Sequence, residues 1–177
     1  MPQIAALPWP QRLARILRHG FSTERQARAA LDASALARIA EHVRQSESRH
    51  RGEIRVCVEA GLPWSYLWKG LRARQRAVML FGKLRVWDTE ENSGVLIYLL
   101  LADHAIEILA DRGLARQVPA QTWQDQVRQL GESFRAGRHE AGLIETVDAV
   151  GALLQRHFPA DAARPNPNEL PDQVDLR

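Results

Sequence analysis

Two carboxylates, Glu59 and Asp103, are the residues of this sequence best placed to do chemistry. Glu59 ends the strand-like segment 53–59, and Asp103 follows the apolar run 95–102. If these two strands lie parallel in one sheet, their carboxyl ends meet at the same edge, where open α/β sheets usually bind ligands. Carboxylate oxygens are ligands that Ca²⁺ and Mg²⁺ accept. The spacing therefore predicts a candidate cation site formed by Glu59 and Asp103.

Each chemical interpretation has a structural alternative. Asp103 and His104 interrupt the apolar run with residues typical of turns, so turn formation alone explains them. Glu47 and His50 stand three apart, as in helical metal sites, but one such pair cannot complete a site, and a helix-end cap or salt bridge explains it. Cys57 lies inside a strand, which favours a buried, inert thiol.

A basic group forms the second candidate. Four cations lie on the predicted helix 65–84 without an acidic residue among them: Arg72, Arg74, Arg76 and Lys83. Such a run usually forms a solvated face, so all four are expected to be exposed. A polyanion-binding surface is the alternative. The sequence holds no nucleic-acid-binding motif, so no specific nucleic-acid partner is expected, and it lacks Walker, dinucleotide, HExxH and GxSxG motifs.

The elements that must position these residues can be predicted from hydrophobic patterns. The chain has 177 residues, of which 45% are hydrophobic and 25% charged, as in an ordinary globular domain. Strands are expected at 53–59, 95–102 and 105–110, the last two as a hairpin, and helices at 34–48, 65–84, from 119–122 to 136, and 140–157. A helix between the first two strands favours a parallel pair with a right-handed crossover. The predicted fold is an α/β/α sandwich with a small mixed β-sheet.

The remaining segments flank this domain. We expect a helical extension over 1–33, the α/β domain over 34–159 and an irregular tail over 160–177. A basic amphipathic helix is expected over residues 8–19, and it packs on its own domain or contacts an anionic membrane. The sequence shows no signal peptide and no apolar segment of transmembrane length, which predicts a cytoplasmic protein, with peripheral membrane contact as an open alternative. Trp9 and Trp64 are candidate contact residues.

The order and sequence of these segments resemble the TPM domain over about residues 35–157. The matching positions are Glu53 to Glu59, Phe81-Gly82, Asn92 to Leu101, Asp103, Ile106 to Ile108, Gly113-Leu114 and Phe134-x-x-Gly137. The resemblance implies an α/β/α sandwich. The tail over 168–172 is similar to that of short bacterial TPM proteins that lack a membrane anchor.

The family resemblance also implies function. Some TPM members bind divalent cations and one hydrolyses phosphate esters, and their acidic edge corresponds here to Glu59 and Asp103. This chain has Ala115 where members often carry Glu, and no Asp within 118–122. With fewer carboxylates we expect Ca²⁺ or Mg²⁺ to bind weakly, on the order of millimolar, and we expect no other cofactor.

These departures from the family pattern favour a non-catalytic interaction module linked to the cell envelope or protein maintenance. Its expected partner is another protein, such as a membrane-anchored TPM protein. The alternatives are a weak cation-dependent phosphatase and a polyanion or membrane-surface binder.

Overall fold

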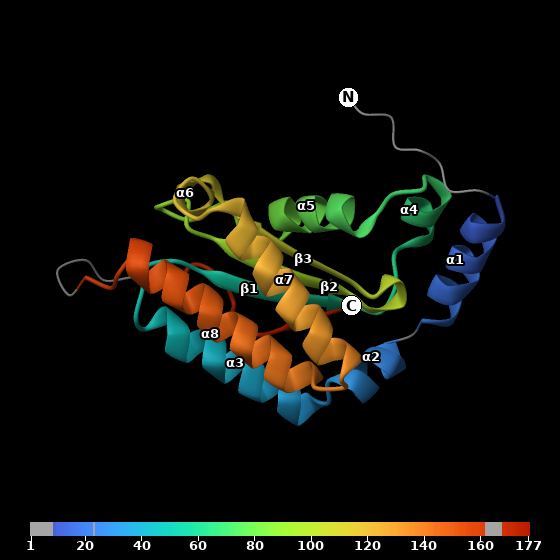
Figure 1. Cartoon of the computed structure of the whole chain (residues 1–177), viewed down its shortest axis with the longest axis horizontal. Helices are drawn as coiled ribbons and strands as arrows, with labels where there is room; N and C mark the ends of the chain where they lie inside the picture. The colour runs from blue at the N-terminus through green and yellow to red at the C-terminus, as the bar shows by residue number, and fades with distance from the viewer. Residues whose placement is uncertain (1–8, 23, 162–167) are drawn as a thin grey trace.

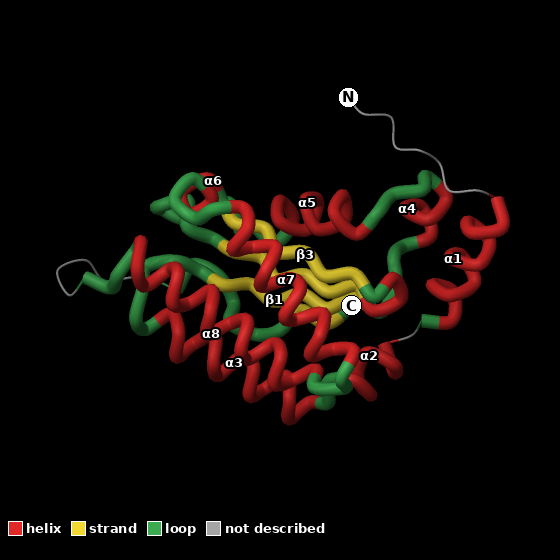
Figure 2. Tube along the Cα trace, viewed as in Figure 1, coloured by secondary structure: helices red, strands yellow, loops and turns green. Residues whose placement is uncertain are grey.

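A mixed four-stranded sheet lies between two layers of helices in the computed structural model, which describes residues 9–22, 24–161 and 168–177 (Figures 1 and 2). The strands are ordered β3-β2-β1-β4 across the sheet. Their bounds are β1 Ile54–Glu59, β2 Val95–Leu100, β3 Ala105–Ala110 and β4 Asp175–Leu176. The predicted fold class, a mixed sheet inside an α/β/α sandwich, is confirmed.

The central strands pair as the sequence predicts. β1 and β2 are parallel, with Glu59 opposite Leu100, and β2 and β3 are antiparallel, with Val95 opposite Ala110. The hairpin turns through a short 3-10 helix, η1 (Leu101–Asp103), and then His104 in the left-handed conformation, with φ of 49°. The parallel pair brings the ends of β1 and β2 to one edge of the sheet.

Helices cover both faces of the sheet, and every residue of β1 and β2 is therefore buried. Ile54, Val56 and Val58 pack in the core formed with α3 (Ala33–Glu47), α7 (Ala120–Arg135) and α8 (His139–His157). Cys57 and Tyr98 face the other core, formed with α4 (Trp64–Trp68) and α5 (Ala73–Lys83). The remaining helices are α1 (Trp9–Phe21), α2 (Glu24–Ala30) and α6 (Arg112–Ala115).

The single helix predicted over 65–84 is wrong, because the segment forms two helices. Helix α4 ends at Trp68, and α5 begins at Ala73. Between them Gly70 has φ of 66°, a left-handed conformation that glycine adopts without a steric penalty. The break changes the direction of the chain, so that α4 lies toward the end of the molecule that carries α1, while α5 covers the sheet (Figure 1).

The prediction that the whole segment 160–177 is irregular is also wrong. Residues 175–176 form β4, which pairs parallel to β1 at Cys57 and Val58. The backbone of Arg177 continues this pairing, since its N–H donates to Val58 O at 2.9 Å and its carbonyl accepts from Ala60 N at 2.8 Å. Leu170 is buried in the core on the α5 side. The C-terminal segment is therefore part of the sheet.

Candidate functional site

Glu59 is a buried carboxylate at the end of β1, 2% exposed. It points toward α5, where the Nε of Arg76 donates to its Oε2 at 2.8 Å, and the hydroxyl of Tyr98 donates to the same oxygen at 2.7 Å. The hydrogen bond to Glu59 is the main cause of a raised Arg76 pKa, whereas burial is the main cause of a raised Tyr98 pKa. Glu59 therefore holds α5 to the sheet.

The prediction that Arg76 is exposed is wrong, because this residue is only 7% exposed. A buried carboxylate needs a cation and hydrogen bonds to offset its lost hydration, and Arg76 supplies both. The other three members of the basic group, Arg72, Arg74 and Lys83, are exposed as predicted. Arg74 also lies near a carboxylate, with its Nη1 3.3 Å from Glu107 Oε2.

Asp103 lies in η1 and is bound by three side chains of α1. The Nη2 of Arg15 donates to Oδ2 at 2.7 Å, Nε2 of His19 lies 2.9 Å from Oδ1, and Nη2 of Arg18 donates to Oδ1 at 3.2 Å. Burial alone would raise the pKa of Asp103, but the hydrogen bonds of His19 and Arg15 outweigh it and hold that pKa well below its usual range. Helix α1 is thus fastened to the carboxyl edge of the sheet.

The two predicted cation ligands share an edge but have different partners. The pairing of Glu59 with Leu100 places Glu59 level with the end of β2, just before Asp103. Glu59 is hydrogen-bonded to α5 and β2, whereas Asp103 is hydrogen-bonded to α1. Within the described residues, no group of three or more His, Cys, Asp or Glu side chains lies close enough to hold a metal ion. Cation binding by Glu59 and Asp103 stays a prediction.

Two other candidate residues have structural roles. His50 is buried and hydrogen-bonded, with Nδ1 2.9 Å from Gly52 O and Nε2 3.0 Å from Ser46 Oγ, and burial lowers its pKa to about 4. Glu47 accepts a hydrogen bond from Ile54 N at 2.9 Å. Cys57 is buried, as predicted, and burial raises the pKa of its thiol to about 12.

A group of exposed apolar side chains on α1 and α4 was only partly identified from the sequence. We define the α1–α4 face as Trp9, Leu13, Leu17, Trp64 and Trp68, which are between 45% and 74% exposed. The three members on α1 and the two on α4 each follow a spacing of four residues, which places them on one side of their helix. The rings of Trp64 and Trp68 stack with centroids 6.4 Å apart. Trp9 and Trp64 were predicted as contacts, whereas Trp68 was not.

Helix α1 contacts the segment that leads into α4. The backbone N–H of Leu62 donates to Nδ1 of His19 at 2.9 Å, and Ile16 packs against the core that contains Leu67. Both helices lie at one end of the molecule (Figure 1). Segments 9–22 and 60–87, which include both helices, contain basic but no acidic residues. The α1–α4 face is therefore apolar, and the charged residues in the segments that carry it are all basic.

Comparison with known proteins places the chain in a family. The TPM domain family matches residues 25–153, which is more than half of the chain. The chain belongs to the TPM domain family. The predicted resemblance is therefore confirmed, and α1, which binds Asp103, lies outside the matched part of the TPM domain.

A solved structure supports the same assignment. The NMR structure of the BA42 protein from the psychrophilic bacterium Bizionia argentinensis is 26% identical, with a TM-score of 0.72. The similarity covers 83% of this chain and 95% of that one. No match was found among curated proteins. In the described part of this TPM protein, no helix has the length and apolar character needed to cross a membrane.

Proposed function

We propose that this TPM protein is a non-catalytic module that binds an anionic membrane surface through the α1–α4 face. The observation that carries the proposal is the exposure of Trp9, Trp64 and Trp68 beside Leu13 and Leu17 on two neighbouring helices. Tryptophan and leucine side chains enter the boundary between headgroups and acyl chains, where an indole keeps its N–H hydrated.

Charge supports the same ligand. Basic residues near an anionic surface each contribute about 1 kcal/mol to binding. Arg18 and Lys69 are exposed on or beside the two helices, and Arg72 follows in the loop before α5. An anionic membrane therefore matches both the apolar and the basic character of this face. It would also bring the module beside membrane-anchored proteins, which include the anchored TPM partner that the resemblance suggests.

The packing of α1 on the domain leaves its apolar side available to a membrane surface. Arg15 and His19 are buried against Asp103, so one side of α1 is fixed to the domain. The opposite side carries Trp9, Leu13 and Leu17. A helix fixed in this way loses little conformational freedom on binding, which favours association.

The alternative, a cation-dependent phosphatase, has less support from the geometry. Both oxygens of Glu59 lie within hydrogen-bond distance of Arg76, and both oxygens of Asp103 accept from α1. A cation would have to compete with these arginines. Calorimetry with Ca²⁺ and Mg²⁺, together with turnover of p-nitrophenyl phosphate, tests this alternative. Tight cation binding, or turnover that is lost in Asp103→Ala, would favour the phosphatase over our proposal.

Vesicle binding tests the proposal directly. The protein should sediment with phosphatidylglycerol vesicles and much less with phosphatidylcholine vesicles, and binding should weaken with salt. Trp9→Ala combined with Trp64→Ala should weaken it roughly tenfold or more. Trp87→Ala is the matched control, because Trp87 is also exposed but follows α5. Equal losses in both variants, or no binding to the anionic vesicles, would refute the proposal.

A further inference from the structure

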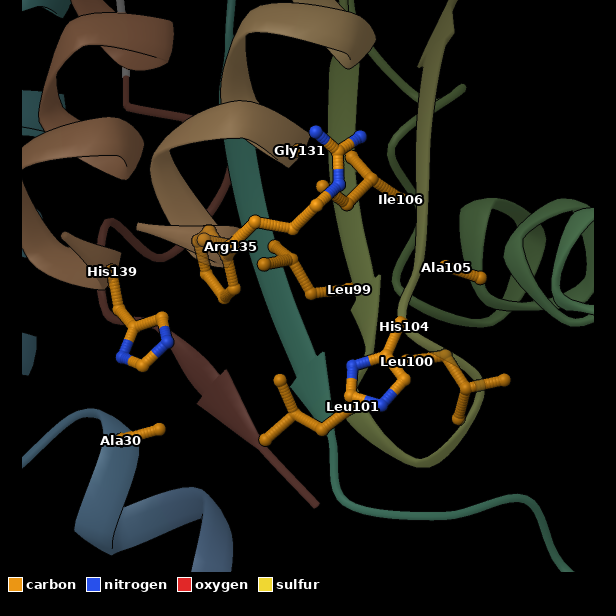
Figure 3. A pocket seen from close by; sticks show the side chains of 11 residues that line it. Ala30, Leu99, Leu100, Leu101, His104, Ala105, Ile106, Gly131, Arg135 and His139 are labelled. Carbon is orange, nitrogen blue, oxygen red and sulfur yellow. The ribbon is translucent and has the colours of Figure 1, made fainter. Parts of the chain in front are cut away.

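A cavity of about 680 Å³ opens beside the end of β2, in the size range of small-molecule sites. It lies among the β2–β3 hairpin, the end of α7, the start of α8 and the end of α2 (Figure 3). Its apolar lining includes Leu99, Leu101, Ile106 and Phe134. These residues are not part of the α1–α4 face, and none of them is hydrogen-bonded to Glu59. The cavity is therefore separate from both of the sites described above.

The lining also contains three side chains with nitrogen atoms that can donate hydrogen bonds. It includes no acidic residue. Arg135 comes from the last turn of α7, His139 from the first turn of α8, and His104 from the hairpin (Figure 3). The guanidinium of Arg135 lies beside Gly131. A Cβ added to Gly131 would be 3.5 Å from Nη2 of Arg135. Among the described residues, Arg135 has no carboxylate partner.

His104 lies at this cavity in a left-handed backbone conformation. Its φ of 49° lies in the left-handed region, which costs a non-glycine residue about 1–2 kcal/mol. Glycine would serve the turn better, since its backbone adopts this conformation freely. The imidazole of His104 lines the cavity across from His139 (Figure 3).

We infer that this cavity binds a small amphiphile with one carboxylate head and a short aliphatic body. Arg135 is the one permanent charge in the lining, and its planar guanidinium matches a carboxylate with two parallel hydrogen bonds. The two imidazoles add N–H donors without requiring a second negative charge. The leucine, isoleucine and phenylalanine side chains receive the aliphatic body.

Octanoate is the probe for this inference. We expect calorimetry to show saturable binding, and amide shifts in NMR spectra to change at Gly131, Phe134 and His139. Octanol, which lacks the charge, should bind at least about tenfold more weakly. Octyl phosphate tests whether the site selects a carboxylate, and stronger binding of the phosphate would overturn that part of the inference.

Three variants connect binding to individual residues. Arg135→Gln should weaken octanoate binding roughly tenfold, and Arg135→Lys should restore part of the affinity. Arg138→Gln is the matched control, because Arg138 is exposed nearby and does not line this cavity. His104→Gly should weaken binding without lowering the melting temperature, because glycine suits the turn. Absence of saturable octanoate binding, or equal affinity in Arg135→Gln and Arg138→Gln, would overturn the inference.

Discussion

The guanidinium of Arg76 in α5 and the carboxylate of Glu59 in β1 form a buried ion pair, with Arg76 Nε 2.8 Å from Glu59 Oε2. The ring of Tyr66 lies under the same guanidinium, with its centroid 5.0 Å from the Arg76 Cζ. The pair joins the helix after the Gly70 break to the end of the inner strand β1. It therefore fixes the position of α5 through a polar contact inside an otherwise apolar layer.

Removing one member of this pair should destabilise the protein strongly. Arg76→Ala leaves the Glu59 carboxylate buried without its cation, which costs about 3–5 kcal/mol in comparable pairs. Urea unfolding measures the loss. Lys83→Ala is the control, because Lys83 is exposed in the same helix and should change stability by less than about 0.5 kcal/mol. Similar losses in the two variants would contradict the role of the pair.

Neutralising Asp103 should release α1 from the domain. Asp103→Asn weakens the hydrogen bonds from Arg15 and His19, and charged hydrogen bonds contribute about 1.5–3 kcal/mol each. Amide hydrogen exchange in α1 should accelerate more than in α8. Because the Asp103 pKa is lowered on folding, its contribution is present above its ordinary pKa of 3.8 and is lost as pH falls below that value. Asp88→Asn, in an exposed loop, should leave α1 exchange unchanged.

Two glutamates beneath the C-terminal segment should make stability fall as pH rises. Burial, with the nearby Glu53, raises the pKa of Glu47 to about 9, and burial raises the pKa of Glu53 to about 7. The folded state holds these protons above pH 4.5, where the unfolded chain releases them, so stability is lost as pH rises toward the folded pKa values.

Glu47→Gln isolates this effect. The variant should gain stability relative to the wild type between pH 5 and pH 9, by about 2 kcal/mol, as measured by urea unfolding. Its amide oxygen can still accept the hydrogen bond from Ile54 N. Glu145→Gln, on the exposed side of α8, is the control. A constant difference between Glu47→Gln and wild type at all pH values would contradict the assignment.

Two glycines in helices should respond to alanine in opposite ways. At Gly151 in α8, an added Cβ would lie 1.9 Å from Ser46 Oγ of α3, so the helices must separate or Ser46 must move. Gly151→Ala should cost about 1–3 kcal/mol. At Gly82 in α5, nothing lies within 4 Å of the added Cβ. Gly82→Ala should stabilise the protein by about 0.5–1 kcal/mol, and thermal unfolding measures both.

Much of the fold could be predicted because its signals are local. The apolar run 95–102 and the alternation within 53–59 are continuous along the chain, and they identify β1 and β2 without knowledge of their neighbours. The break at Gly70 was missed because an isolated glycine is tolerated within many helices. β4 was missed because two residues are too few to form a pattern.

The roles of the charged residues were harder to predict because they depend on distant partners. Arg76 was expected in a solvated run, although Glu59 stood in a strand that is buried on both faces and required a cation. The need of a buried Glu59 for a cation could have indicated that one of the nearby arginines is buried with it. By contrast, no pattern in the sequence indicates that Arg15 binds Asp103, 88 residues away, or that Arg135 and His104 line one cavity.

The pairing of β4 with β1 has a consequence for synthesis on the ribosome. The Arg55 guanidinium of β1 donates to the carbonyl of Gln173, which lies 118 residues later in the chain. The nascent chain therefore emerges with the hydrogen-bonding groups of one β1 edge unpaired until residues 173–177 are available. Open strand edges promote association between chains. A variant truncated after residue 167 should form oligomers in size-exclusion chromatography, whereas the full chain closes that edge itself.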